Sequence, residues 1–355
     1  MISTILAKTI TLCTAMLSLF VAGVISIPQP SQFSDWTVAC DNVLHCEAIA
    51  GFASGGSADE WTLHVTRSAL PQAAPQVEGF PAFGGPIESG RIRFDGREEG
   101  FKFENNGQLV GDPYAFLSAL ARARIVEVMS HHGNVIGTLP SSGASAALRW
   151  IDDKQGRAGT VTAIVARGQQ PATDVPPAPV LPRIAQPATS SAPPRLLSSS
   201  DVRTIRSLGE GCEENPPEDF PLGVETYRLD STYTVGIVGC FLGAYQGPSV
   251  IVVIDEEGSW DLAPIELPEE MAEYRLGSPW QHMLTGAGYS SEDRLLTEWS
   301  KGRGLADCGT SASWAWDGEI FRLTAYRSLE VCSGAQPGTW PSLWQTANDP
   351  IGDGD

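Results

Sequence analysis

The sequence predicts a mainly β protein with a few short helices (α+β class), in two disulfide-stapled domains joined by a Pro/Ser-rich linker. Three observations support this class. Short segments in which apolar and polar residues alternate recur along the chain, as in strands with one buried face. Six of the seven cysteines follow an apolar N-terminal stretch. Eight prolines fall within residues 168–200, where fixed φ angles and missing amide donors prevent sheet pairing.

Residues 1–26 have the order of a secretory signal peptide. Lys8 precedes an apolar stretch from Ile10 to Val24, and small residues between Ala22 and Ser26 offer a cleavage site. The stretch is shorter than the roughly 20 apolar residues that span a bilayer, and an uncleaved anchor is the alternative. We expect a periplasmic or secreted protein without stable membrane insertion after signal cleavage.

The cysteines beyond this stretch indicate a disulfide framework. Their even number is typical of an oxidising compartment. Sequential pairing is favoured because no pair then crosses the linker. No C-x-x-C motif or zinc-site spacing occurs, so the cysteines indicate structure rather than metal or redox chemistry. The expected pairs are Cys40 with Cys46, Cys212 with Cys240, and Cys308 with Cys332.

The N-terminal domain, 31–167, is expected to mix strands with two helices. Asp112 followed by Pro113 is typical of a helix start, and this helix is expected to run to about residue 124. Ser142 is a candidate cap for a second helix, whose apolar positions are Ala144, Ala147, Leu148 and Ile151. Alternating strands are expected at 61–66, 91–95 and 101–104, a turn at 106–107, and a closing apolar strand at 160–166.

The C-terminal domain, 201–350, is expected to be mainly β after one short helix. Val202, Ile205 and Leu208 have helical spacing. Strands are expected at 233–240 and 250–254, and hairpin turns at Asp255–Gly258 and Asp317–Gly318.

Acidic residues are concentrated in the second half of the chain. The formal net charge is −19; residues 1–200 carry 14 Lys/Arg against 16 Asp/Glu, and residues 201–355 carry 9 against 26. This balance argues against a nucleic-acid partner, because phosphates require a basic face. It permits a cationic partner, such as a basic protein or another envelope component, and solubility alone is the alternative.

No arrangement of residues indicates catalysis. The segment Gly309–Ser313 lacks the final glycine of a nucleophile elbow. No phosphate-binding loop, H-E-x-x-H helix or complete EF-hand occurs, so we predict no cofactor and no metal. Two carboxylates of a glycan or peptide hydrolase stay open as an alternative, because 26 acidic residues crowd the second half.

Seven of the ten tryptophans lie beyond the linker. Exposed tryptophans stack on sugars or hold cations, whereas most large aromatic residues belong to cores. We predict a ligand- or partner-binding surface at Arg303, Asp307, Trp314 and Trp316. The alternative is that Arg303 and Asp307 pair to fix a turn beside a disulfide.

Several segments, in order, resemble the proteobacterial exported proteins of domain-of-unknown-function family 1176. In the motif from Gly302 to Gly309, this chain has Ala306 where the family glycine is expected. The early tryptophan and cysteine pair is also similar to that of invasion-associated locus B proteins. The segments are Phe33–Trp36, Val38–Asn42, Cys46, Gly302–Gly309, Trp314–Gly318, Phe321–Leu323, Cys332 and Trp340–Pro341.

The family resemblance implies an exported protein without an established activity, and it transfers no catalytic residue. We therefore expect a non-enzymatic protein of the cell envelope that binds a partner or ligand through its acidic C-terminal domain. The alternatives are a cell-envelope hydrolase with unassigned carboxylates and a host-contact or virulence factor. The last alternative rests on the locus B likeness.

Overall fold

The structure, a computed structural model, describes residues 23–52, 59–85, 89–209, 211–212, 222–278 and 280–348. Strands dominate these ranges, with four α-helices among them, which confirms the mainly β class. The strands form four five-stranded sheets and one two-stranded parallel pair. No helix in the described ranges is long and apolar enough to cross a membrane.

Two sheets and two helices form an N-terminal unit around one core, which draws its buried residues from Trp36 to Ile164. In this core Trp61 stacks on Phe103 with ring centroids 5.9 Å apart. The first sheet has the order β2 (Ser31–Phe33), β3 (Trp36–Cys40), β4 (Cys46–Ala50), β5 (Trp61–Arg67) and β6 (Gln76–Pro81). The second has the order β11 (Val135–Leu139), β10 (Val126–Met129), β7 (Gly90–Phe94), β8 (Arg97–Phe103) and β9 (Leu109–Val110). The helices are α1 (Pro113–Leu120) and α2 (Ala144–Lys154), and a 3₁₀ turn spans Ala82–Gly84.

The strands predicted in this unit are confirmed as β5, β7 and β8, but three local predictions were wrong. Helix α1 ends at Leu120 because the Asp95 carboxylate accepts the amides of Arg124 and Ile125 and draws the chain towards β10. The N-cap of α2 is Gly143, not Ser142: its φ of 92° favours glycine, and a Cβ there would meet the carbonyl of Phe33. Residues 160–166 form turns instead of a strand, since the amides of 164–166 bind the Asp152 carboxylate.

The C-terminal unit holds the other two sheets. One has the order β12 (Val224–Arg228), β13 (Thr234–Gly239), β14 (Pro248–Ile254) and β15 (Trp260–Leu262), with β17 (Met283–Thr285) also paired to β14. The other has the order β18 (Gly288–Ser290), β19 (Leu295–Lys301), β20 (Gly309–Trp316), β21 (Phe321–Leu329) and β22 (Ser342–Gln345). The helices are α3 (Ser199–Leu208) and α4 (Glu269–Arg275). The predicted helix, strands and hairpin turns of this half are confirmed, although the β20–β21 loop spans 317–320.

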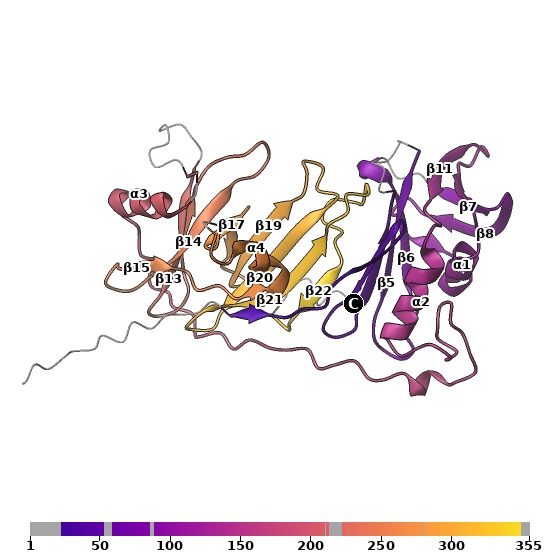
Figure 1. Cartoon of the computed structure of the whole chain (residues 1–355), viewed down its shortest axis with the longest axis horizontal. Coiled ribbons are helices and arrows are strands. Elements are labelled where there is room, and N and C mark those ends of the chain that lie inside the picture. Colours follow the sequence, from indigo (N-terminus) through magenta and orange to yellow (C-terminus); the bar gives the residue numbers. More distant parts are fainter. Residues whose placement is uncertain are drawn as a thin grey trace, which may run out of the picture.

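The first described residues belong to the C-terminal unit. Strand β1 (Val24–Ile25) pairs in parallel with β16 (Leu267–Pro268), and Ile27 is buried in the C-terminal core. Figure 1 shows β1, in indigo, beneath the yellow strands of this unit. Residues that the sequence assigned to the leader, 23–26, are thus part of the fold, while the rest of the predicted signal, 1–22, lies outside the described residues.

The predicted linker, 168–200, is extended over most of its length and lies against both units (Figure 1). Its first residues fold back on the N-terminal unit through a 3₁₀ turn at Ala172–Asp174, and its last residues begin α3. In between, Ile184 exchanges hydrogen bonds with the Asn348 side chain, and Gln186 donates to the carbonyl of Arg294. The division into two independently folding domains stays a prediction.

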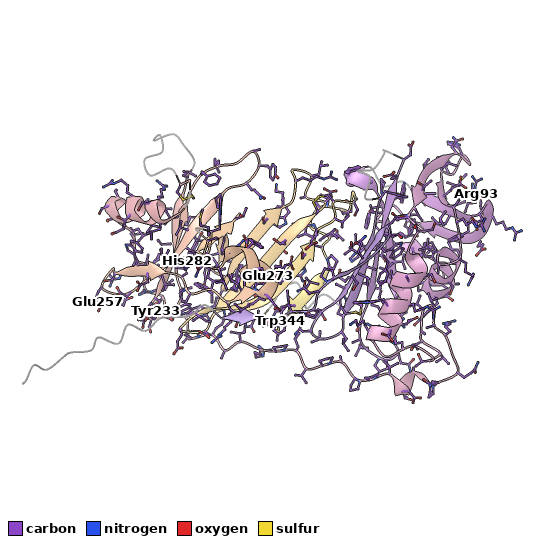
Figure 2. All side chains as sticks on the ribbon, in the orientation of Figure 1. Arg93, Tyr233, Glu257, Glu273, His282 and Trp344 are labelled. Carbon is purple, nitrogen blue, oxygen red and sulfur yellow. A yellow bond between two sulfur atoms is a disulfide. The ribbon has the colours of Figure 1, made fainter. Side chains whose placement is uncertain are left out.

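All three sequential disulfides are confirmed: Cys40–Cys46, Cys212–Cys240 and Cys308–Cys332. Each closes a loop within one unit. Acidic side chains such as Glu257, on the β14–β15 turn, and Glu273, on α4, are exposed on the C-terminal unit (Figure 2).

Candidate functional site

Arg303 and Asp307 form a two-pronged ion pair beside the Cys308–Cys332 disulfide. The guanidinium Nε and NH2 lie 2.7 and 2.5 Å from the two carboxylate oxygens. The buried Asp307 also accepts the amide of Gly334 at 2.8 Å. The ion pair and this amide lower the pKa of Asp307 despite its burial. This geometry is that of the alternative in which the pair fixes a turn.

Trp314 and Trp316 are core residues rather than surface residues. Both are almost fully buried, and their indole N–H groups are satisfied: Trp314 donates to the carbonyl of Glu266 at 2.7 Å and Trp316 to the carboxylate of Asp230 at 2.8 Å. The structure therefore brings Arg303 together with Asp307 but buries both predicted tryptophans in the core. A binding role for these four residues stays a prediction.

Ala306, in the same loop, has a φ of 56°, the left-handed conformation that favours glycine. We expect Ala306→Gly to raise the free energy of unfolding by about 1 kcal/mol, because the Cβ strain is removed. Chemical denaturation of both proteins measures this difference. Equal or lower stability of the glycine variant would show that the loop tolerates alanine without strain.

A cavity lies between the two units. We call it the central cavity; its volume is about 980 Å³. One wall is the face of the β2–β6 sheet opposite the N-terminal core. A second wall comes from β21, β22 and residues 338–340, and Ala178, Pro179 and Leu181 of the extended segment close one side.

A chain of charged groups crosses the first wall. His64 on β5 is directly opposite Glu78 on β6 and diagonal to Glu47 on β4. Its Nε2 lies 2.8 Å from a Glu47 oxygen, and its Nδ1 lies 3.6 Å from Glu78. Burial disfavours both charges, but the mutual hydrogen bonds outweigh it: the pKa of His64 rises to about 9 and that of Glu47 falls to about 2. The other Glu47 oxygen accepts the amide of Ser342 from the opposite wall at 3.1 Å, so this carboxylate joins the two units.

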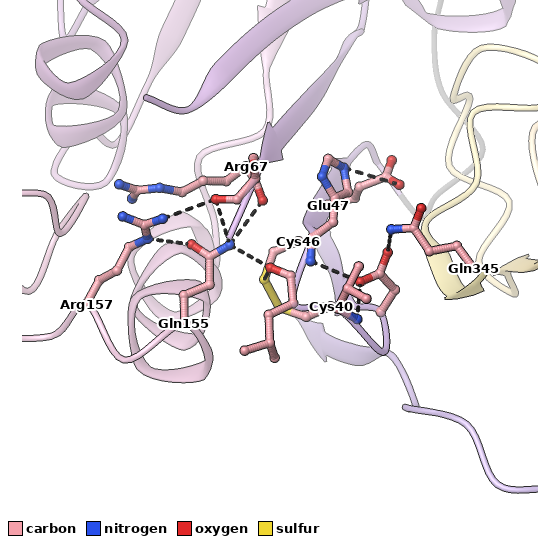
Figure 3. The surroundings of a disulfide bond; sticks show 12 residues. Cys40, Cys46, Glu47, Arg67, Gln155, Arg157 and Gln345 are labelled. Atoms are coloured by element: carbon pink, nitrogen blue, oxygen red, sulfur yellow. Dashed lines mark hydrogen bonds and ion pairs between the residues drawn. A yellow bond between two sulfur atoms is a disulfide. The ribbon is translucent and has the colours of Figure 1, made fainter. Parts of the chain in front are cut away.

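A second set of hydrogen bonds joins the two units at the loop that the Cys40–Cys46 disulfide closes (Figure 3). The side chain of Asn42 and the backbone of Gln345 exchange two hydrogen bonds, of 2.9 and 3.0 Å. Asp41 accepts the amides of Val43 and His45 and, at 2.5 Å, the side-chain amide of Gln345. Burial raises the pKa of Asp41 to about 6 against these hydrogen bonds and the nearby His45. The disulfide thus fixes a loop whose polar groups hold the cavity walls together.

Two buried groups on the second wall have no hydrogen-bond partner in the described structure. They are the indole Nε1 of Trp340 and the hydroxyl of Ser342; both residues line the cavity. Trp340 is 2% and Ser342 5% exposed. Such groups are rare in folded proteins, because burial removes their bonds to water.

The carboxylates of the cavity are fully engaged in hydrogen bonds. Both oxygens of Glu47 and both of Asp41 accept hydrogen bonds within the protein, so neither presents a free oxygen to attack a substrate. Within the described ranges, Asp307, Cys308 and Cys332 come close enough to share a metal ion. The two cysteines are joined in a disulfide, so their sulfur atoms are not thiolate ligands.

The central cavity could not be predicted from the sequence. The alternation of β5 identified Thr62, His64 and Thr66 as one face, but only the fold shows that this face meets the C-terminal unit. One sequence feature could have pointed to it: the titratable residues Asp41, His45 and Glu47 lie close together around one disulfide.

Comparisons with known proteins place the chain without giving it an activity. It is similar to the uncharacterized protein YpfG of Escherichia coli strain K12, with 28% identity over 346 residues, covering 90% of this chain and 93% of that protein. No solved structure matches. The likeness to invasion-associated locus B proteins stays a prediction. A family model described as protein of unknown function (DUF1176) matches residues 30–347, and the chain therefore belongs to this family.

Proposed function

We propose that this protein is an exported, non-catalytic binding protein whose central cavity takes a small, uncharged, hydroxyl-rich molecule of the sugar class. The carrying observation is the pair of unpartnered buried groups on the cavity wall, Trp340 Nε1 and Ser342 Oγ. An indole N–H needs an acceptor, and a hydroxyl takes either role. A sugar hydroxyl supplies both.

The charges of the cavity support an uncharged ligand. Glu47, His64 and Asp41 already pair within the walls, and Arg327 also has a partner. A charged ligand would lose its hydration there without gaining a free countercharge. The lining also offers uncharged polar side chains, among them Thr66, Gln76 and Thr339. The volume of about 980 Å³ suits a ligand of this size.

Export is part of the proposal. Three disulfides support it, because such bonds form and persist in oxidising compartments such as the periplasm or the outside of the cell. The apolar leader of the sequence agrees with this location.

The test is calorimetric binding of chitobiose, cellobiose and maltose to the full chain, with citrate and dilysine as charged probes. We expect at least one neutral disaccharide to bind and both charged probes to fail. Ser342→Ala should weaken that binding about tenfold, the equivalent of one lost hydrogen bond. Its free energy of unfolding should stay within about 1 kcal/mol of the parent, because the hydroxyl has no partner in the protein.

Two further variants sharpen this test. Trp340→Phe keeps a ring but removes the donor, so it should behave like Ser342→Ala. Ser207→Ala is the control, since this hydroxyl lies on α3 and bonds the carbonyl of Thr204. Failure of every neutral disaccharide to bind, or parental affinity in both cavity variants, would contradict the proposal.

A second candidate is an envelope hydrolase that uses Asp41 and Glu47. The favouring observation is that burial raises the pKa of Asp41 to about 6 while His64, against the effect of burial, brings that of Glu47 to about 2; such a split is typical of an acid and its ionised partner. We favour binding because the oxygens of both residues are occupied. Turnover of peptidoglycan fragments that Asp41→Asn abolishes would reverse this preference.

A basic partner of the acidic C-terminal surface remains a separate prediction. Binding of such a partner would have an affinity that falls steeply with added salt. The full chain is required for this test, because β1 and the extended segment pack on the C-terminal unit and would be missing from 201–355 alone.

A further inference from the structure

The exposed tryptophans of the C-terminal unit are not the ones that the sequence singled out. Trp299, on β19, is 42% exposed, and Tyr245, in the loop that follows β13, is 46% exposed. Between them lies Lys301, whose Nζ is 5.2 Å from the Trp299 ring and 5.3 Å from the Tyr245 ring. We call these three residues the aromatic strip.

The strip is held in place by backbone contacts. The side-chain amide of Gln246 accepts the Lys301 amide at 2.9 Å and donates to its carbonyl at 3.4 Å, which fixes the Tyr245 loop against β19. Trp299 and Lys301 are two residues apart on one strand and therefore share a face of the sheet. The rings are thus preorganised, so little conformational entropy is lost when a ligand stacks on them.

The strip leads into the central cavity. The ring of Trp299 lies 6.0 Å from that of Trp340, which lines the cavity. Trp299 is also directly opposite Ser311, and Ser311 opposite Arg327, another lining residue. Residues opposite one another across strands share a face, so the strip and the cavity wall lie on one face of the β18–β22 sheet, about 10 Å apart.

We infer that the aromatic strip is a stacking subsite that extends the central cavity, so that the ligand is a neutral glycan chain rather than a single small sugar. This inference rests on the proposed function. Exposed rings in a row suit the apolar faces of successive sugars, and Lys301 supplies donors to their hydroxyls.

Charge favours a glycan over other occupants of the strip. A basic peptide would meet Lys301 in the centre of the strip and Arg303 two residues further on. A polyanion would face the strong negative charge of residues 201–355, which carry 26 acidic against 9 basic residues. A neutral glycan meets neither obstacle.

The test compares a short and a long neutral glycan, chitobiose and chitohexaose, by calorimetry on the full chain. The parent protein should bind chitohexaose more tightly than chitobiose. Trp299→Ala and Tyr245→Ala should each weaken chitohexaose binding about tenfold and leave chitobiose binding unchanged. Tyr274→Ala is the matched control, because Tyr274 is equally an exposed tyrosine (57%) but lies on α4, outside the strip. Thermal unfolding of each variant checks that it is folded.

The outcomes separate this inference from the proposed function. If chitobiose binds and chitohexaose binds no more tightly, or if both strip variants bind chitohexaose like the parent, the strip is not a subsite and the cavity proposal survives. If neither glycan binds, both fail. If the strip variants instead abolish oligolysine binding or a concentration-dependent dimer, the strip serves a basic peptide or a second copy, and the inference is overturned.

Discussion

Asp152→Ala is expected to lower the free energy of unfolding by at least about 4 kcal/mol. Asp152 is fully buried on α2, and its carboxylate accepts three backbone amides, those of 164–166, at 2.7–3.0 Å. It also lies 3.6 Å from the buried guanidinium of Arg67. Alanine would leave one buried and two partly buried amides without an acceptor and the buried Arg67 without its countercharge. The cost is about 1–3 kcal/mol for a buried amide and more for the charge.

The Asp152→Ala substitution should also disturb the wall of the central cavity. Arg157, beside Asp152 in the same buried network, donates to the carbonyls of Ser68, Leu70 and Pro71, and Ser68 and Leu70 line the cavity. Urea denaturation of Asp152→Ala and of the control Asp153→Ala, whose side chain is exposed, measures the difference. A loss below about 1 kcal/mol in Asp152→Ala, comparable with surface substitutions, would show that this network is not needed for the fold.

The Glu47–His64 pair is expected to make stability depend on pH in a defined direction. The pKa of His64 is raised from 6.5 to about 9 in the folded protein, so its contribution is complete below pH 6.5 and is lost as the pH rises through 9. The pKa of Glu47 is lowered from 4.5 to about 2, so its contribution is present above pH 4.5 and is lost as the pH falls towards 2.

The titration of Asp41 changes the stability in the direction opposite to that of Glu47. Its folded pKa is raised from 3.8 to about 6, so its contribution is lost as the pH rises from 3.8 through 6. Above about pH 7 Asp41 and Glu47 are almost fully ionised in the folded protein, so of these three groups mainly His64 changes charge. We expect the free energy of unfolding to fall by about 2–3 kcal/mol between pH 6.5 and 9.5 because of His64, at about 1.4 kcal/mol for each pKa unit.

His64→Gln is the variant that isolates this effect, since glutamine keeps a polar group but does not titrate. Denaturation at several pH values should show a decline in the parent and a flat profile in the variant over the same range. Equal slopes in the two proteins would mean that the pair does not stabilise the junction of the two units.

Much of the fold could be predicted from the sequence because its signals are local. The alternation of Trp61, Leu63 and Val65, the capping of α1 by Asp112 and the hairpin turn at Asp317 each depend on neighbouring residues. The disulfide pairing followed from keeping each pair on one side of the linker. The failures, at the end of α1, at Gly143 and at 160–166, depend on contacts with residues outside the local segment, namely Asp95, Phe33 and Asp152.

The site could not be predicted because it depends on which sheet faces meet. Trp299 and Trp314 both lie in alternating strands, and only the pairing of β19 with β20 and the packing of the core make Trp314 buried and Trp299 exposed. Likewise, nothing near His64 in the sequence shows that Ser342 lies across a cavity from it. Tryptophan density pointed to Trp314 and Trp316, which are buried, and not to Trp299, which is exposed.

A crystal structure of the full chain with chitohexaose would show where the glycan binds. We expect a glycan that hydrogen-bonds Ser342 Oγ and Trp340 Nε1 within the central cavity and stacks on Trp299 and Tyr245 outside it. A glycan bound elsewhere on the protein, with both cavity groups still unpartnered, would contradict this expectation.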